Sequence, residues 1–510
     1  MVRSQLQHVI LVEVDATTDR DDAGRDGAGR GALRGAARAP GGPDEPNPPG
    51  ARMAGRLAGG LRRSWPLVAA VIVVLVRVLG SAIPELRVRQ RFARLADLPG
   101  VLAPVDSSLR EQWRAPGQGW GELLGIGDRI VVFGRDPTGA MGVTALDAAT
   151  GEQVWRTPFA AVTARGTLTC VPPDADESHL VCLVQTGALT DGDPDRATPT
   201  RLVVLAADTG RKVADRALRS NNAGAVSLGS DVVVTQVLPD ARAAVTRLDP
   251  VTGDTRWAFR SRAVLRTPST GPAWLYPIVE NGVVVANGPV TWAFTADGAV
   301  LGEWHLQGGD WAVRGGWGLG VSALRNGWFA VGEDGGVGLS DEDYGTVSET
   351  DARDGFSISG PVLVPVVDDG SAPDVLLTAP AGRGGVVAIE GTTGERLWSA
   401  GAATWGSALV LDGRVIESAG GELRAYDAQT GLPLWTLPVP MGNHAKQVLT
   451  DGRLVLVPRF DLTLGGVVTA VDPADGRVQW TAALPPRTGR LVVVAGHLLV
   501  ATGRDLVAMG

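Results

Sequence analysis

Two cysteines, Cys170 and Cys182, are the residues whose type and spacing most directly suggest covalent chemistry. They bound the run CVPPDADESHLVC, whose apolar ends, TLTC and LVCL, would pair as a hairpin across a polar loop and bring the two sulfur atoms together. A disulfide is expected if this part of the chain lies in an oxidising compartment. The alternative is a pair of small thiols buried on adjacent strands.

Other residue combinations that could support catalysis or metal binding do not form recognisable sites. The five histidines are scattered without ligand spacing, which argues against a zinc site. The run DGDPD at 191–195 resembles the start of a calcium loop, but Arg196 replaces the glycine expected at the sixth position and Leu202 replaces the glutamate expected at the twelfth. We expect an acidic surface loop there. No nucleophile elbow, phosphate loop or Cys–His arrangement is present, so no catalytic, metal or cofactor residue is assigned.

Three Trp-Gly pairs are candidates for a binding surface. Trp120, Trp317 and Trp405 each begin a short apolar run, in GWGELLG, GWGLGVS and TWGSALV. If these runs are the inner strands of a ring, the three indoles would surround one mouth of its channel and offer a contact surface to a peptide or a sugar. The alternative is structural, with glycine serving tight bends and tryptophan filling wedges between elements.

The elements that would position these residues come from a sequence repeat. LDAATGEQVW at 146–155 recurs as LDPVTGDTRW, IEGTTGERLW, YDAQTGLPLW and VDPADGRVQW, with weaker copies between them. The turn glycines of successive copies are 37 to 59 residues apart, a period typical of propellers and solenoids. Each period holds short Val- and Leu-rich runs bounded by Gly, Asp-Gly or Asn-Gly, and none holds ten residues of helical periodicity. Four short strands per period predict the blades of a β-propeller.

The repeated phrase has a structural interpretation. An apolar strand ends at an aspartate whose carboxylate accepts backbone N–H groups, glycine supplies the positive φ of the turn, and the next strand carries a tryptophan that fills the wedge between blades. The residues concerned are Asp147, Gly151, Trp155, Asp249, Gly253, Trp257, Gly394, Trp398, Asp427, Gly431, Trp435, Asp472, Gly476 and Trp480.

The two ends of the repeat region are expected to close the ring. EQWRAP at 111–116 resembles a Trp-bearing outer strand without its three partners, and residues 489–510 supply three strands without a fourth. Together they would complete one blade and remove a free edge. We therefore expect an all-β propeller of about eight four-stranded blades over residues 110–510. Counting every unit gives nine, one of which is weak enough to be an insertion.

The first hundred residues differ in composition from the rest. Residues 1–63 are rich in Gly, Ala, Arg, Asp and Pro, cannot bury enough apolar surface to offset chain entropy, and are expected to be disordered. Residues 64–84 contain the nineteen-residue run WPLVAAVIVVLVRVLGSAI, which as a helix would span about 28 Å, so a single uncleaved transmembrane helix is expected. Arg77 opposes insertion, but it lies near the end of the run and can reach the interface. Residues 85–109 would be a juxtamembrane linker.

The distribution of charge argues against one class of partner but does not decide the orientation in the membrane. The formal net charge is −8 and no basic stripe follows residue 100, which argues against nucleic-acid binding. Four arginines precede the apolar span and four follow it, so the positive-inside rule does not decide. The expected disulfide favours a cytoplasmic N-terminus and an extracytoplasmic C-terminal domain.

The Asp-x-x-Thr-Gly-x-x-x-Trp pattern of residues 110–510 resembles the repeat of the quinoprotein-like, or PQQ-like, propellers. That family includes quinone-dependent alcohol dehydrogenases, BamB-like assembly factors and sensor domains, so the resemblance implies a fold more than a function. The dehydrogenases carry two adjacent cysteines above the quinone and hold a calcium ion with Glu, Asn and Asp. Cys170 and Cys182 are twelve positions apart, and no residue here aligns with the calcium ligands.

These observations lead to one expectation for function and two alternatives. We expect a single-pass membrane protein whose extracytoplasmic propeller binds or scaffolds envelope or extracellular proteins, without a cofactor and without catalysis. The first alternative is a sensor or small-ligand propeller that uses its channel. A quinone-dependent dehydrogenase comes third.

Overall fold

The computed structural model describes residues 95, 98, 100–118, 121–136, 138–159, 166–172, 178–185, 199–220, 222–265, 274–306, 318–323, 329–334, 347–349, 355–358, 362–378, 385–400, 407–419, 421–439, 447–461 and 465–510. Every element of two or more described residues is a β-strand, and Leu95 alone is helical. None of the described residues belongs to a helix with the length and apolarity that crossing a membrane requires. The predicted span at 64–84 and the predicted disordered tail at 1–63 lie outside the described residues.

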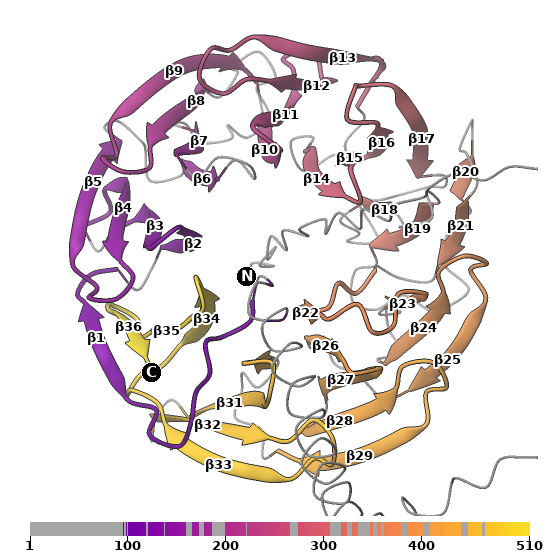
Figure 1. The fold of residues 1–510 in the computed structure, drawn as a ribbon. Helices are drawn as coiled ribbons and strands as arrows, with labels where there is room; N and C mark the ends of the chain where they lie inside the picture. The colour runs from indigo at the N-terminus through magenta and orange to yellow at the C-terminus, as the bar shows by residue number, and fades with distance from the viewer. Residues whose placement is uncertain are drawn as a thin grey trace, which may run out of the picture. The chain divides into compact units, whose positions relative to one another are not determined.

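The compact unit that includes Arg94–Gly510 is a ring of β-sheets, each running from the ring centre outward (Figure 1). Four sheets are four-stranded antiparallel meanders in chain order. They are β2 (Glu122–Ile126), β3 (Arg129–Arg135), β4 (Met141–Asp147) and β5 (Gln153–Phe159); β6 (Thr167–Val171), β7 (His179–Gln185), β8 (Pro199–Ala206) and β9 (Lys212–Arg219); β10 (Asn222–Leu228), β11 (Asp231–Val237), β12 (Arg242–Leu248) and β13 (Thr255–Val264); and β30 (Leu449–Thr450), β31 (Val455–Asp461), β32 (Gly465–Val471) and β33 (Val478–Ala483).

A fifth four-stranded sheet joins the two ends of the repeat region. It contains β34 (Arg490–Val494), β35 (His497–Ala501), β36 (Leu506–Met509) and β1 (Glu111–Ala115). β1 pairs antiparallel with β36 and is the outermost strand of the blade. The predicted closure of the ring by the two chain ends is therefore confirmed.

Two further blades gain a strand from elsewhere in the chain. β14 (Tyr276–Glu280), β15 (Val283–Asn287), β16 (Val290–Phe294) and β17 (Val300–Leu306) are extended at their outer edge by β20 (Val347–Glu349). β26 (Ala408–Leu411), β27 (Arg414–Ala419), β28 (Glu422–Asp427) and β29 (Pro433–Pro438) are extended at their inner edge by β22 (Val367–Asp368), which runs parallel to β26.

The eighth blade is β23 (Val375–Thr378), β24 (Val386–Glu390) and β25 (Arg396–Ala400), with Val362 bridging Thr378 on its inner side. The remaining sheet, β18 (Gly318–Ala323), β19 (Phe329–Asp334) and β21 (Gly355–Ile358), contains a parallel pair and is not a four-stranded meander. It lies between the blade of β14–β17 and that of β23–β25 (Figure 1). The described residues therefore form an eight-bladed, all-β propeller, with this irregular sheet in addition to the eight blades.

The hydrophobic core is divided among the junctions between blades. Because alternate side chains of a strand face opposite sides, each blade contributes to two clusters. On β31, for example, Leu456 faces the blade of β34–β36, whereas Val455 and Val457 face the blade of β26–β29. The stability of the ring thus depends on contacts between neighbouring blades.

Candidate functional site

The tryptophan of an outer strand docks on the turn of the next blade. The indole of Trp398 on β25 covers Gly431, and its Nε1 donates to the carbonyl oxygen of Ala428 at 2.8 Å. Gly431 has φ +68°, and a Cβ built there would lie 2.4 Å from Trp398 Cγ, so only glycine fits both the turn and the ring above it. The same contact joins Trp113 to Gly151, Trp155 to Gly210, Trp257 to Gly298 and Trp435 to Gly476.

The aspartate of each repeated phrase organises the same turn. Asp427 Oδ1 accepts the hydroxyl and the N–H of Thr430 at 2.8 and 2.9 Å, and the N–H of Gln429 at 3.1 Å. These hydrogen bonds hold the pKa of Asp427 below its ordinary value. Asp147, Asp249 and Asp472 accept turn N–H groups in the same way, and Glu390 takes this position before Gly394. These carboxylates are engaged in turn formation.

One junction uses an arginine where the five junctions above use an indole. In the blade of β6–β9, Ala214 stands at the tryptophan position and Arg216 follows two residues later. The Arg216 guanidinium lies against Gly253 and donates to the carbonyl oxygens of Pro250 and Val251. Sequence reasoning missed this residue, and its only signal was the missing tryptophan in AADTGRKVAD.

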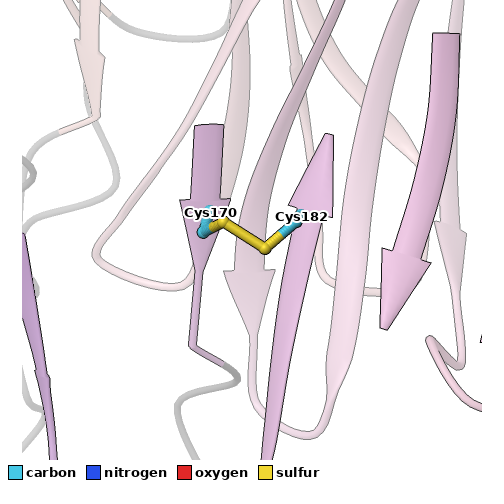
Figure 2. Close-up of a disulfide and its surroundings, with 2 residues drawn as sticks. All are labelled: Cys170 and Cys182. Carbon is cyan, nitrogen blue, oxygen red and sulfur yellow. A yellow bond between two sulfur atoms is a disulfide. The ribbon is translucent and has the colours of Figure 1, made fainter. Parts of the chain in front are cut away.

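The two cysteines form a disulfide between the two innermost strands of one blade (Figure 2). Cys170 on β6 stands opposite Cys182 on β7, with their Cα atoms 4.1 Å apart. Both side chains are buried in the cluster between the blades of β2–β5 and β6–β9. The bond therefore fixes the register of this hairpin inside the core.

A segment before β1 covers part of the ring's inner edge. It runs from near the ring centre to the outer rim (Figure 1). Val101 forms a parallel bridge with Thr450 of β30, and the Leu102 N–H donates to the Thr450 carbonyl oxygen at 2.9 Å. The Ala103 N–H donates to the carbonyl oxygen of Gly496 at 2.8 Å. Residues 101–103, which lie within the predicted linker at 85–109, thus pack as part of the propeller unit.

Side chains of this segment complete two junctions. Val101 is buried between the blades of β26–β29 and β30–β33, whereas Leu102 is buried between β30–β33 and β34–β36. Asp451 accepts the N–H of Val105 at 3.3 Å, and Arg453 donates to the Val105 carbonyl oxygen at 3.1 Å. With β22 along β26, the chain itself covers the inner edges of two neighbouring blades.

A buried carboxyl group lies between the blades of β23–β25 and β26–β29. Glu417 on β27 is 3% exposed, and Tyr426 donates its hydroxyl to Glu417 Oε1 at 3.2 Å. The guanidinium of Arg424, across the ladder from Glu417, is hydrogen-bonded to Glu422 instead. Burial raises the pKa of Glu417 above its ordinary value, and the Tyr426 hydrogen bond opposes this shift.

Exposed aliphatic side chains occur on several outer strands, and three of them lie on or beside two neighbouring strands, β29 and β33. Leu432 and Leu434 are 64% and 46% exposed before and within β29, and Val478 is 48% exposed on β33. Trp435 docks on Gly476, two residues before Val478, so these side chains flank one junction. Among the outermost blade strands β1, β5, β9, β13, β17, β25, β29 and β33, only β29 and β33 contain no charged residue. We call Leu432, Leu434 and Val478 the apolar rim.

The predicted mouth-lining tryptophans, Trp120, Trp317 and Trp405, lie outside the described residues, as does the acidic run at 191–195. No group of three His, Cys, Asp or Glu side chains able to hold a metal ion occurs within the described ranges. Cys170 and Cys182 are bonded to each other inside a junction, so they do not form the adjacent pair that the quinone-dependent dehydrogenases carry. The cysteines of this chain therefore do not fit the dehydrogenases' quinone site.

Comparisons with known proteins give one family match and several solved structures of low sequence identity. Residues 100–258 and 464–509 match the family model described as outer membrane protein assembly factor BamB. A search of curated proteins finds no match. Among solved structures, BamB from Moraxella catarrhalis is 16% identical, with 79% of this chain and 97% of that chain covered and a TM-score of 0.43. A quinohemoprotein alcohol dehydrogenase from Pseudomonas putida HK5 is 13% identical, with 82% and 78% covered and a TM-score of 0.43.

The family match covers the first blades and the closing blade, the part of the ring in which Trp113 docks on Gly151 and Trp155 on Gly210. The repeated turn, the docked indole and the closure of the ring by both chain ends are all present in the described residues. The described residues of this chain thus form a β-propeller of repeated turns, and residues 100–258 and 464–509 are similar to the family described as outer membrane protein assembly factor BamB.

Proposed function

We propose that this chain is a membrane-tethered, extracytoplasmic propeller that binds protein partners and has no catalytic activity of its own. The observation that carries the proposal is the apolar rim, where exposed leucine and valine side chains stand on two uncharged neighbouring strands. Surface patches of this kind are typical of protein contact sites. The BamB family match supports a role in binding proteins, because the model is described as an assembly factor.

Two further features support the proposal. The inner edges of β26 and β30 are covered by β22 and by residues 101–103, so this part of the ring centre is occupied by the chain's own backbone. The Cys170–Cys182 disulfide is of the kind that persists in oxidising compartments, which supports an extracytoplasmic propeller. The apolar run at 64–84 supplies the proposed anchor.

Cross-linking in intact cells that express the full chain, followed by mass spectrometry, tests partner binding. We expect the same envelope or extracellular protein to be recovered in independent experiments, with cross-links on outer strands. Recovery of the chain alone would contradict the proposal. Protease added to whole cells tests the orientation. We expect the propeller to be cut to the same extent before and after lysis, because an extracytoplasmic domain is already accessible. A propeller that is cut only after lysis would contradict the proposed orientation.

Catalysis is tested separately by thermal unfolding with and without pyrroloquinoline quinone and calcium. We expect the same Tm in both conditions, because a ligand raises Tm only if it binds the folded state. A rise of several degrees, followed by alcohol oxidation in the same sample, would overturn the non-catalytic part of the proposal.

A further inference from the structure

One outer strand of this propeller already pairs with an added strand. Residues 304–306 of β17 form an antiparallel ladder with β20, which comes from more than forty residues further along the chain. Three residue pairs make this ladder. The outer edge of a blade in this ring can therefore accept a short extended segment.

The outer edge of β29 has the same geometry and is the last strand of its sheet in the described residues. The Val439 N–H donates to the Gly421 carbonyl oxygen at 2.8 Å, so Val439 faces β28. Since hydrogen-bonding direction alternates along an antiparallel strand, Thr436 and Pro438 face the free edge. Thr436 thus offers an N–H and a carbonyl to an added strand, whereas Pro438 lacks a donor and limits the ladder at that end.

Edge strands are normally protected by charges or prolines, and β29 has a proline at each end but no charge. On β5, the equivalent of Thr436 is Arg156, five residues after the turn glycine in both blades, and its guanidinium is paired with Asp136. Thr436 is exposed and neutral, and Leu434 is exposed beside it. The edge of β29 therefore lacks the charge that would repel an uncharged strand.

We propose that the free edge of β29 binds an extended, uncharged, apolar segment of a partner protein as an added antiparallel strand. Its main chain pairs with Thr436, and its apolar side chains pack against the apolar rim. This inference deepens the proposed function and rests on it. The site selects for strand-like segments rather than folded surfaces, because its polar groups are those of a β-ladder.

A peptide probe tests the edge directly on the full chain. The probe is a capped, fluorescently labelled peptide of alternating threonine and valine, and its binding is followed by anisotropy. Thr436→Pro removes the outward N–H while leaving the bonds to β28, and Leu434→Glu places a charge on the rim. We expect both to weaken binding at least about tenfold, the effect of roughly 1.4 kcal/mol.

Val154→Glu is the matched control for Leu434→Glu. Val154 is 47% exposed and, like Leu434, stands three residues after the turn glycine of its blade. We expect it to leave peptide binding unchanged. Equal loss in this variant, or no binding of the probe to the wild-type chain at millimolar concentration, overturns the inference. If Thr436→Pro fails to fold, an N-methylated probe replaces it, because methylation removes the peptide's own ladder donors.

Photo-cross-linking in cells distinguishes this inference from the broader proposal. A photoreactive amino acid replaces Thr436, or Arg156 as the equivalent edge position on β5. Adducts to one partner protein at 436 but not at 156 support the inference. Equal adducts at both positions preserve partner binding but overturn the assignment to β29. Adducts to another part of the chain itself or to a second copy, or no adduct at either position, also overturn it.

Discussion

The indole of Trp398 on one blade covers Gly431 on the next so closely that a Cβ on the glycine would lie 2.4 Å from Trp398 Cγ. Gly413, in an earlier turn of the same blade as Gly431, has the same φ of +68° but has nothing within 4 Å of a Cβ. The two glycines thus share one backbone conformation and differ in what lies above them. Substitutions at the two glycines can therefore distinguish the effect of turn geometry on stability from the effect of blade docking.

Gly431→Ala is expected to lower the free energy of unfolding more than Gly413→Ala does. Both substitutions force alanine to a positive φ, which costs about 1 kcal/mol. Only Gly431→Ala also displaces the Trp398 indole, for which overpacking adds about 1–3 kcal/mol. Urea unfolding of the two variants measures the difference. Equal losses would mean that the indole moves without penalty.

Arg216→Met is expected to destabilise the junction between the blades of β6–β9 and β10–β13. Methionine keeps much of the aliphatic volume but leaves the carbonyl oxygens of Pro250 and Val251 without the guanidinium donors, a loss of about 1–3 kcal/mol. Arg219→Met, at an exposed position on the same strand, is the control and should stay within about 0.5 kcal/mol of wild type. Indistinguishable unfolding curves for the two variants would contradict the docking role of Arg216.

Glu417→Gln is expected to make the chain more stable than wild type at neutral pH. At low pH the two chains are expected to be closer in stability. Because burial raises the pKa of Glu417 in the folded state, the folded chain binds this proton more tightly than the unfolded chain. The contribution of Glu417 to wild-type stability therefore falls as pH rises above the ordinary glutamate value of 4.5. Glutamine does not titrate, so the Tm of Glu417→Gln should exceed the Tm of wild type by a margin that grows from pH 4 to pH 8.

Tyr426→Phe provides a second test of the buried carboxyl group of Glu417. The Tyr426 hydroxyl hydrogen bond lowers the pKa of Glu417, so its removal should make the wild-type decline with pH steeper. In the Glu417→Gln background, Tyr426→Phe should leave the pH dependence unchanged. A Tm that does not depend on pH in any of these variants would show that the carboxyl group is not confined as described.

Leu102→Ala is expected to lower the free energy of unfolding by about 2–5 kcal/mol, as for a leucine removed from a core. Leu102 is buried between the blades of β30–β33 and β34–β36, although it precedes the first blade strand in sequence. Val364→Ala, at a position that is 46% exposed, is the control and should have little effect. A small effect at both positions would mean that the segment before β1 is dispensable.

Reduction of the Cys170–Cys182 disulfide is expected to lower the free energy of unfolding by about 3 kcal/mol, the loop entropy for a closed segment of this length. A Cys170→Ala/Cys182→Ala double variant should be insensitive to reductant. Maleimide labelling of intact and lysed cells then tests the compartment. Labelling of unfolded wild-type chain without prior reduction would show free thiols and contradict an oxidising location.

Local patterns were sufficient to predict the blade and its turns. The repeated phrase contains an apolar run, an aspartate, a glycine and a tryptophan within about ten residues. The conformational preference of each acts over only a few residues, so the sequence reveals it. Asp427, Gly431 and Trp398 therefore have the turn and wedge roles expected of them. The pairing of β1 with β36 was also predictable, because each end lacked the strands that the other supplies.

Contacts between segments distant in sequence were decided only by the folded ring. Nothing around Arg216 indicates that its guanidinium takes the place of a docked indole above Gly253, and nothing in residues 101–103 marks them as part of the core. The same holds for the uncharged edge of β29, which becomes a feature only when most other outer strands are seen to carry charges. Local sequence determines which backbone conformations are favoured, whereas closure of the ring determines which side chains meet, because packing depends on positions that no short-range pattern encodes.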